Sequence, residues 1–247
     1  MKLQSFQECM NHATKKIHVS EEQLIKLSAV FEPIPVGKPI SKEMDKTCIE
    51  IVNQHGTNHT FVDFSTSNQI ICTCFMNGFP LCVISIKNIL YTPEELRKQC
   101  PDYKAVGEIK DEKVFPITLL WANDKINIDL ATHSVAQLGI IADLDRYLAI
   151  KENLTQSKIE SHRITINSNS PLLGNRKTRR QNKKNRASQQ TDVIKNTLII
   201  SLPDSDLLED ITMKEFNIKK RTVKAHKRTL KNGIVKEFPE KTYYKVV

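Results

Sequence analysis

Residues Ile211–Val247, with the sequence ITMKEFNIKKRTVKAHKRTLKNGIVKEFPEKTYYKVV, carry the pattern that decides our expectation for the fold. Thr212 is of a residue type that caps helix N-termini, and it precedes a short helical segment, Met213–Phe216. Asn217–Lys220 is a polar turn around a single apolar residue. A second helix is then expected over Arg221–Lys231. The stretch therefore predicts a helix-turn-helix.

The second of these helices depends on the spacing of its apolar residues. Val223, Leu230 and Ile234 recur at helical intervals. Asn232 and Gly233 form a C-cap signal, because these residue types adopt the left-handed conformation that ends a helix. The basic residues lie mostly on the other faces of this helix: Lys220, Arg221, Lys224, Lys227 and Arg228.

Two β-rich runs follow the second helix. Ile234–Phe238 and Thr242–Val247 flank a turn at Pro239, so they predict a hairpin. Upstream, residues 191–210 are rich in apolar side chains, but β-branched content and helical spacing disagree, so both a helix and a strand remain open. We expect residues 191–247 to form one C-terminal domain that folds alone.

The segment ITMKEFNIKKRTVKAHKRTL resembles the helix-turn-helix of winged-helix regulators, and it is similar also to the LuxR-type helix and to region 4 of bacterial sigma factors. In such proteins the second helix enters the major groove, where its exposed side chains meet phosphates and base edges. The resemblance implies nucleic-acid-binding roles for Lys220, Arg221, Thr222, Lys224, Lys227 and Arg228. The alternative interpretation is a basic, solvated helix on a small α+β cap.

The net charge of +9 is unevenly distributed along the chain. Residues 1–150 contain 15 Lys and Arg against 18 Asp and Glu, residues 151–190 contain 10 against 2, and residues 191–247 contain 12 against 8. The basic charge therefore belongs to the last hundred residues or so. It indicates a polyanionic partner for that part of the chain, and nucleic acid is the first candidate.

Residues 153–190 are dominated by Ser, Asn, Gln, Lys and Arg, a composition typical of a disordered linker. Seven of the eleven residues from Arg176 to Arg186 are basic and none is acidic. This segment resembles the arginine-rich RNA-binding motif of lambdoid phage N antiterminators, which folds as a bent helix on an RNA hairpin. The other interpretations are a tether that strengthens DNA binding through phosphates, and a linker without a role. The candidate binding residues here are Arg176, Lys177, Arg179, Arg180, Lys183 and Lys184.

Residues 1–152 predict an α+β domain with an antiparallel sheet and flanking helices. Ser20 and Gln23 form a capping-box pattern at the start of a helix. Apolar runs between residues 47 and 90 predict strands, and Asn77-Gly78 predicts a hairpin turn between two of them. Helices are also expected over residues 93–99 and 134–152, and a further hairpin over residues 114–130.

The cysteines raise the question of a metal site. Cys72, Cys74 and Cys82, with His55 and His59 nearby in sequence, offer only a Cys-x-Cys spacing, whereas zinc sites favour two to four intervening residues. Alternate strand residues share one face, so this spacing also arises in an ordinary strand. We therefore interpret these cysteines as buried thiols of a β core.

A second group offers acid–base side chains: His133, Asp129, Asp143 and Asp145. Nothing in the sequence places these four together, and we expect Asp143 and Asp145 to be solvated. The sequence contains no phosphate-binding glycine loop and no nucleophile motif. We therefore expect no cofactor, no bound metal and no enzyme activity.

The fold class expected from these patterns is α+β, with an N-terminal antiparallel-sheet domain (1–152), a basic linker (153–190) and a C-terminal winged helix-turn-helix (191–247). The expected function is a DNA-binding transcriptional regulator, of phage or mobile-element origin by its resemblances. The alternatives are a sigma decoy that binds host RNA polymerase, an N-like RNA-binding antiterminator and a DNA-processing enzyme. Double-stranded DNA is the first expected partner, followed by RNA through the basic linker and host RNA polymerase. Without an apolar run of membrane-spanning length or a signal-peptide region, we expect a cytoplasmic protein.

Overall fold

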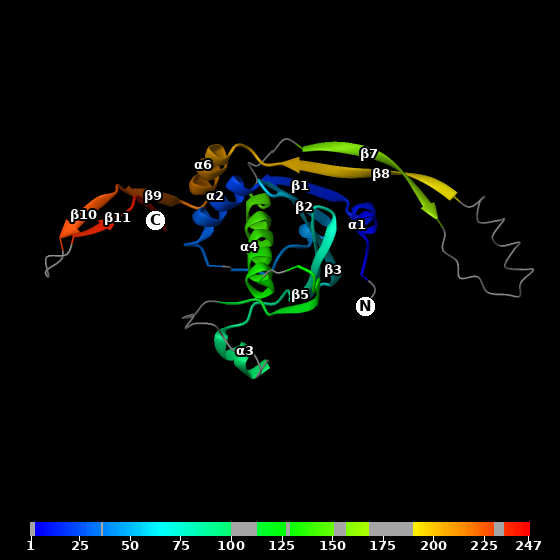
Figure 1. Cartoon of the computed structure of the whole chain (residues 1–247), viewed down its shortest axis with the longest axis horizontal. Helices are drawn as coiled ribbons and strands as arrows, with labels where there is room; N and C mark the ends of the chain where they lie inside the picture. Colours follow the sequence, from blue (N-terminus) through cyan, green and yellow to red (C-terminus); the bar gives the residue numbers. More distant parts are fainter. Residues whose placement is uncertain are drawn as a thin grey trace, which may run out of the picture.

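An eight-stranded mixed β-sheet forms the body of the molecule (Figure 1). The computed structural model describes residues 3–35, 37–99, 113–126, 129–150, 157–167, 190–229 and 235–247. The strands of this sheet are β1 (Lys15–Ser20), β2 (Thr47–Asn53), β3 (Gly56–Thr66), β4 (Gln69–Met76), β5 (Phe79–Lys87), β6 (Ile117–Ala122), β7 (Ser157–Asn167) and β8 (Gln190–Ser201). Their order across the sheet is β6-β5-β4-β3-β2-β1-β8-β7. The fold is α+β in broad terms.

The expectation of an antiparallel sheet is wrong, because β1 runs parallel to both β2 and β8. The helix α2 (Glu21–Phe31) connects β1 to β2, and it carries the chain back so that both strands run in the same direction. This helix begins at Ser20, whose Oγ accepts a hydrogen bond from Gln23 N at 3.2 Å, while Gln23 Oε1 accepts one from Ser20 N at 2.7 Å. The capping box predicted from the sequence is confirmed.

Strands β2 to β6 form an antiparallel meander. Between β4 and β5, Asn77 and Gly78 make a two-residue turn with φ values of 51° and 80°. Asn and Gly tolerate this left-handed backbone better than other residues, so the turn is set by local chemistry. The hairpin predicted at this turn is confirmed.

Helices cover the two faces of the sheet unequally. α2 and α4 (Leu130–Leu148) pack on one face, over the larger apolar core that contains Ile49, Ile84 and Ile141. α1 (Phe6–His12) packs on the other face, over a smaller cluster around Phe61 and Phe75. α3 (Pro93–Gln99) lies at the lower edge of Figure 1. No helix in the described part of the chain has the length and apolar character needed to span a membrane.

The segment expected as a linker contributes a strand. β7 pairs with β8 along its whole length, out to Asn167 opposite Gln190. Only the last residues of β8 pair with β1, and they place Ile199 and Ile200 in buried positions. The rest of the β7–β8 pair extends beyond the sheet (Figure 1). Residues 168–189, which contain the basic run, lie outside the described residues.

The expected C-terminal winged helix-turn-helix is wrong. After β8, the described residues form one helix, α6 (Ser205–Glu215), and Thr212 lies inside it, donating a hydrogen bond to Leu208 O at 2.7 Å. Asn217 follows with a left-handed backbone, φ 51°, and the chain then changes from helix to strand. The remaining elements are four strands: β9 (Ile218–Val223), β10 (His226–Thr229), β11 (Val235–Phe238) and β12 (Lys241–Val246).

The error arose because the same residues fit two patterns, the repeat of a helix and the alternation of a strand. Val223 fits a helical repeat only together with Leu230 and Ile234, which lie outside the described residues. In the structure, β9 and β12 form a ladder in which β-branched residues, a type favoured in strands, lie opposite each other at Thr222–Thr242 and Ile218–Val246. The expected wing is corrected as well, because β11 pairs with β10 and β12 pairs with β9 rather than with each other.

Candidate nucleic-acid interface

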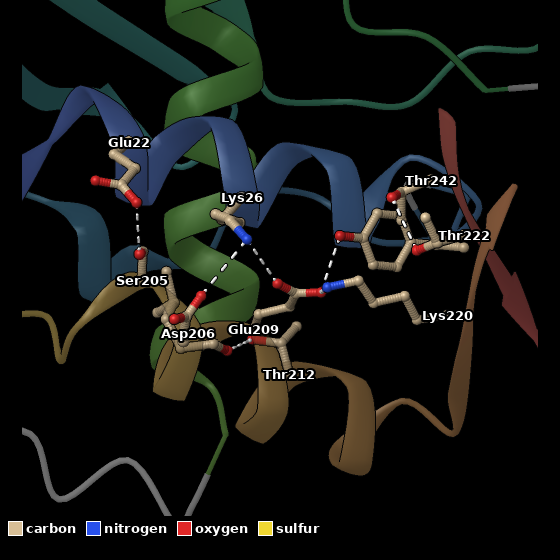
Figure 2. Close-up of polar contacts among 11 residues, drawn as sticks. Glu22, Lys26, Ser205, Asp206, Glu209, Thr212, Lys220, Thr222 and Thr242 are labelled. Atoms are coloured by element: carbon tan, nitrogen blue, oxygen red, sulfur yellow. Dashed lines mark hydrogen bonds and ion pairs between the residues drawn. The ribbon is translucent and has the colours of Figure 1, made fainter. Parts of the chain in front are cut away.

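One carboxylate anchors the C-terminal ribbon, a name that we give to β9 to β12. Glu209 of α6, with a side chain only 4% exposed, lies 2.7 Å from Lys220 Nζ of β9 and 3.0 Å from Lys26 Nζ of α2 (Figure 2). Its Oε1 also accepts a hydrogen bond from Tyr244 OH of β12 at 2.9 Å. Burial alone would raise the pKa of Glu209, but the hydrogen bonds from Lys220, Lys26 and Tyr244 outweigh burial and lower it. Glu209 thus joins β9 and β12 of the ribbon to α6 and α2 of the body.

The side of the β9–β12 ladder turned away from Glu209 is basic. Cross-strand partners lie on the same side of a ladder, so Lys219 lies beside Lys245 and Arg221 beside Tyr243, with Lys241 next along that side. These positions alternate with Lys220 and Tyr244, which point to Glu209. The four cations and Tyr243 on the basic side are all exposed, and this side of β9 and β12 carries no acidic residue. We call Lys219, Arg221, Lys241, Tyr243 and Lys245 the basic face.

Tyr243 places an aromatic ring among the cations of the basic face. Its side chain is 48% exposed, although tyrosine is a large and partly apolar residue. Lys241 Nζ lies 5.1 Å from the centroid of the ring. An exposed aromatic ring surrounded by cations offers phosphate contacts together with a surface for stacking, the combination used by proteins that bind single-stranded nucleic acids.

The outer ladder, β10 with β11, repeats this composition on one side. His226 stacks on Phe238 with ring centroids 5.1 Å apart, and Lys236 Nζ lies 5.6 Å from the Phe238 centroid. Arg228 pairs with Lys236 across the ladder. Two residues on each strand separate this ladder from the inner one, since the inner ladder ends at Val223 and Lys241. The outer ladder therefore adds further cations and rings toward the tip of the ribbon.

The residues expected on one recognition helix are divided among several surfaces. Arg221 belongs to the basic face, whereas Lys220 is bound to Glu209 on the other side. Thr222 contacts Thr242 across the ladder, with the two hydroxyl oxygens 3.2 Å apart (Figure 2). Lys227 forms an ion pair with Glu237 of β11. Lys224, between the two ladders, and Arg228, on the outer one, are exposed.

The candidates of the basic run lie outside the described residues: Arg176, Lys177, Arg179, Arg180, Lys183 and Lys184. In sequence they fall between Asn167 and Gln190, the last pair of the β7–β8 ladder. Six ribbon residues were missed from the sequence: Lys219, Lys236, Phe238, Lys241, Tyr243 and Lys245. The signal that could have found four of them is the alternation along IKKRTV and KTYYKV, which separates one side of a strand from the other, and Lys236 and Phe238 alternate in the same way along VKEF.

The acid–base group considered from the sequence is not assembled. Asp129 accepts hydrogen bonds at the start of α4, and Asp145 accepts one from Ser41 N at 3.0 Å. Asp143 lies 3.8 Å from Arg146, and burial raises the pKa of Asp143 to about 6. The carboxylates thus have separate structural contacts, and the described residues offer no shared acid–base site among them.

The other member of that group, His133, lies beside two of the cysteines. The ligand atoms of Cys74, Cys82 and His133 all lie within 4.8 Å of one another, a geometry that could hold a metal ion. A hydrogen bond with Cys74, and a weaker one with His133, lower the pKa of the Cys82 thiol to about 5 in spite of its burial. His59 is on the opposite face of the sheet, 3.0 Å from Glu50. The histidine that joins the cysteines is therefore not one of those close to them in sequence.

No family model, curated protein or solved structure matches this chain. We therefore infer a function from the charges, rings and contacts of the ribbon itself.

Proposed function

We propose that this protein is a cytoplasmic DNA-binding regulator that holds duplex DNA with the basic face of its C-terminal ribbon. The observation that carries the proposal is a set of four cations around an exposed tyrosine, with no acidic residue on the same side of the ladder. Double-stranded DNA is a dense row of phosphates, and neutralisation of phosphates by Lys and Arg supplies most sequence-independent affinity. The basic face has the charge and the exposure that this contact requires.

Repulsion within the ribbon supports the same partner. Lys219 lies opposite Lys245, and Arg228 lies opposite Lys236. Like charges directly opposite each other destabilise an antiparallel pair. A polyanion relieves this repulsion when it binds, so the ribbon gains more from phosphates than the same number of separated cations would gain.

The shape of the ribbon suits a DNA groove. Neighbouring strands lie about 4.8 Å apart, and the major groove of B-DNA, about 12 Å wide, admits a two-stranded ribbon. The ribbon projects from the body at the side of α6 (Figure 1). Arg221 on its basic face carries a forked guanidinium that fits O6 and N7 of guanine together. A pair of strands would thus do here what a recognition helix does in other regulators.

The basic run adds a second source of phosphate contacts. Residues 176–186 contain seven cations and no acidic residue. They connect β7 to β8, which extend from the sheet on the side opposite the C-terminal ribbon in Figure 1. Contacts through such a run depend on charge rather than sequence, so it would strengthen binding to any duplex.

Titrations of labelled duplex DNA at several salt concentrations test the proposal. The triple variant Lys219→Ala, Arg221→Ala, Lys245→Ala should bind more weakly, and its slope of log K against log salt should fall by about 0.9 for each phosphate that the variant no longer neutralises. The control matched in charge is the triple variant Arg97→Ala, Lys98→Ala, Lys113→Ala, which removes three exposed cations, two of them from α3, far from the ribbon (Figure 1). The control should leave both affinity and slope unchanged.

Two results would overturn the proposal. One is an equal loss, or no loss, of affinity in the ribbon variant and the charge-matched control. The other is stronger binding to an RNA hairpin than to duplex DNA, abolished by deletion of residues 176–186 and untouched by the ribbon variant. That second result would assign the protein to RNA through the basic run.

A further inference from the structure

Two cysteines on neighbouring strands face the helix that covers them. Cys74 of β4 pairs directly with Cys82 of β5, and both belong to the apolar core under α4. Cys74 is 2% exposed and Cys82 is fully buried. His133 lies in the first turns of α4, and its imidazole completes a group of three ligand atoms within 4.8 Å of one another. Three separate elements thus converge on one point.

A β-bulge produces the pairing of the two cysteines. Next to the Asn77-Gly78 turn, Phe75 pairs with Pro80, but the following pair is Cys74 with Cys82, so Leu81 is an extra residue on β5. Without this shift, Leu81 rather than Cys82 would lie opposite Cys74. Bulges re-aim side chains and occur often beside functional sites. The bulge in β5 therefore places the two thiols opposite each other.

The imidazole of His133 has an unmet hydrogen-bonding atom. His133 Nε2 is buried and has no hydrogen-bond partner among the described residues. Leaving a buried polar atom unpaired is unfavourable, so such atoms in a folded protein call for an explanation. A metal ion between His133 and the two thiols supplies one, because an imidazole nitrogen is a common metal ligand.

We propose that Cys74, Cys82 and His133 bind a zinc ion. Thiolate and imidazole ligands select zinc and similar thiophilic ions rather than magnesium or calcium. With bonds of about 2.3 Å to sulfur and 2.0 Å to nitrogen, ligand atoms around zinc lie about 3.5–4 Å apart, so distances within the observed group, which reach at most 4.8 Å, need to shorten by no more than about 1.3 Å. Three protein ligands leave the fourth position of a tetrahedral site to water.

Two buried polar side chains form a hydrogen bond close to Cys74. Thr60 Oγ1 lies 3.8 Å from Cys74 Sγ and donates a hydrogen bond to Gln137 Oε1 at 2.6 Å. Gln137 follows His133 by one turn of α4, and both Thr60 and Gln137 are buried. Groups that hydrogen-bond around metal ligands hold them in orientation. The hydrogen bond to Gln137 thus fixes the Thr60 hydroxyl beside the Cys74 thiol.

Zinc titration of the reduced full-length protein, freed of metal by a chelator, tests the proposal in competition with a chromophoric chelator. The expected result is one tight site per chain. Cys74→Ala, Cys82→Ala and His133→Ala should each weaken it by about 100-fold or more, since even groups that only orient ligands contribute 10- to 100-fold. The matched control is Cys48→Ala, which removes a fully buried thiol from the opposite face of the sheet and should leave the site intact.

X-ray absorption at the zinc edge of the unsubstituted protein gives an answer that does not depend on how the variants fold. The expected ligand set is two sulfurs and one imidazole nitrogen. Zinc bound only by nitrogen and oxygen, the absence of stoichiometric zinc binding, or a Cys74–Cys82 disulfide in metal-free protein would overturn the proposal. So would a loss of affinity in Cys48→Ala equal to that in Cys82→Ala.

Discussion

The eight-stranded sheet and the C-terminal ribbon are both made of paired strands, but different forces hold them. In the sheet, side chains such as Ile49 and Ile84 are fully buried under α2 and α4. In the ribbon, all four residues of β10 are exposed, and Ile218 is the one buried residue of β9. What attaches the ribbon is chiefly the set of polar contacts around Glu209. An apolar core stabilises the body, whereas the ribbon is attached through a polar anchor that leaves the cations of its basic face exposed.

The largest difference between the two regions is expected in the free energy of unfolding that is lost when an apolar side chain is shortened. Ile84→Ala should lower the free energy of unfolding by about 3 kcal/mol, because it leaves a cavity between β5 and α4. Val223→Ala should cost about 0.5 kcal/mol or less, because Val223 on the ribbon is only half-buried. Chemical denaturation of both variants measures the difference. For the same reason Val223→Asp should leave the body folded, and equal losses of stability in the two alanine variants would contradict the comparison.

The next largest effect is expected at Glu209, which anchors the ribbon to the body. Glu209→Gln removes the charge that pairs with Lys26 and Lys220 and should weaken the attachment of the ribbon by about 2 kcal/mol. Hydrogen exchange should then accelerate at β9 and β12 but not at β3 and β4. The matched control is Asp206→Asn, since Asp206 is 91% exposed and lies 3.6 Å from Lys26. Acceleration in both variants alike would show that Glu209 has no special role.

The same anchor predicts a dependence on pH. The pKa of Glu209 is lower in the folded protein than in the unfolded chain, where it is about 4.3. Its contribution is therefore fully present above pH 4.3 and is lost as the pH falls through the folded value. Exchange at β9 and β12 should rise in this acid range in the native protein. In Glu209→Gln this rise should be absent.

A smaller dependence of stability on pH, with the opposite sign, is expected in the body. Burial raises the pKa of Asp143 to about 6, so the folded protein binds this proton more tightly than the unfolded chain does. Between about pH 4 and 6 the buried charge then costs increasing stability as the pH rises. Asp143→Asn should be on the order of 1–2 kcal/mol more stable than the native protein at pH 7 and nearly equal to it at pH 4. Thermal unfolding at the two pH values measures this, and a difference that stays constant with pH would refute the role of the buried charge.

Local chemistry was sufficient to predict some elements of the fold. The capping box of Ser20 and Gln23 and the Asn77-Gly78 turn depend only on residues within a few positions, and both are confirmed. The pairing of β8 with β1 joins residues about 180 positions apart, so no local sequence pattern predicts it. The C-terminal stretch failed for another reason: a short run of apolar residues satisfies a helical and a strand period at once, and pairing with β12 decided between them.

The candidate metal site was out of reach for a similar reason. Cys74 and Cys82 are close in sequence, but their pairing depends on a bulge at Leu81 that the spacing does not reveal. His133 arrives from a helix some fifty residues later, while His55 and His59, which are nearer in sequence, lie elsewhere. Spacing finds ligands that share one loop, but it does not find ligands that a sheet and a helix bring together.

If DNA meets one side of a two-stranded ribbon, the effects of substitution along β9 should alternate. The measurement is an alanine substitution at each residue from Lys219 to Lys224, with the affinity for a duplex determined at fixed salt. Lys219→Ala and Arg221→Ala should each cost on the order of 1 kcal/mol, and Thr222→Ala should cost nothing. Lys220→Ala should act only through the stability of the ribbon. Reductions in affinity spaced three or four residues apart, at Arg221 and Lys224 but not at Lys219, would contradict the ribbon and favour a helix.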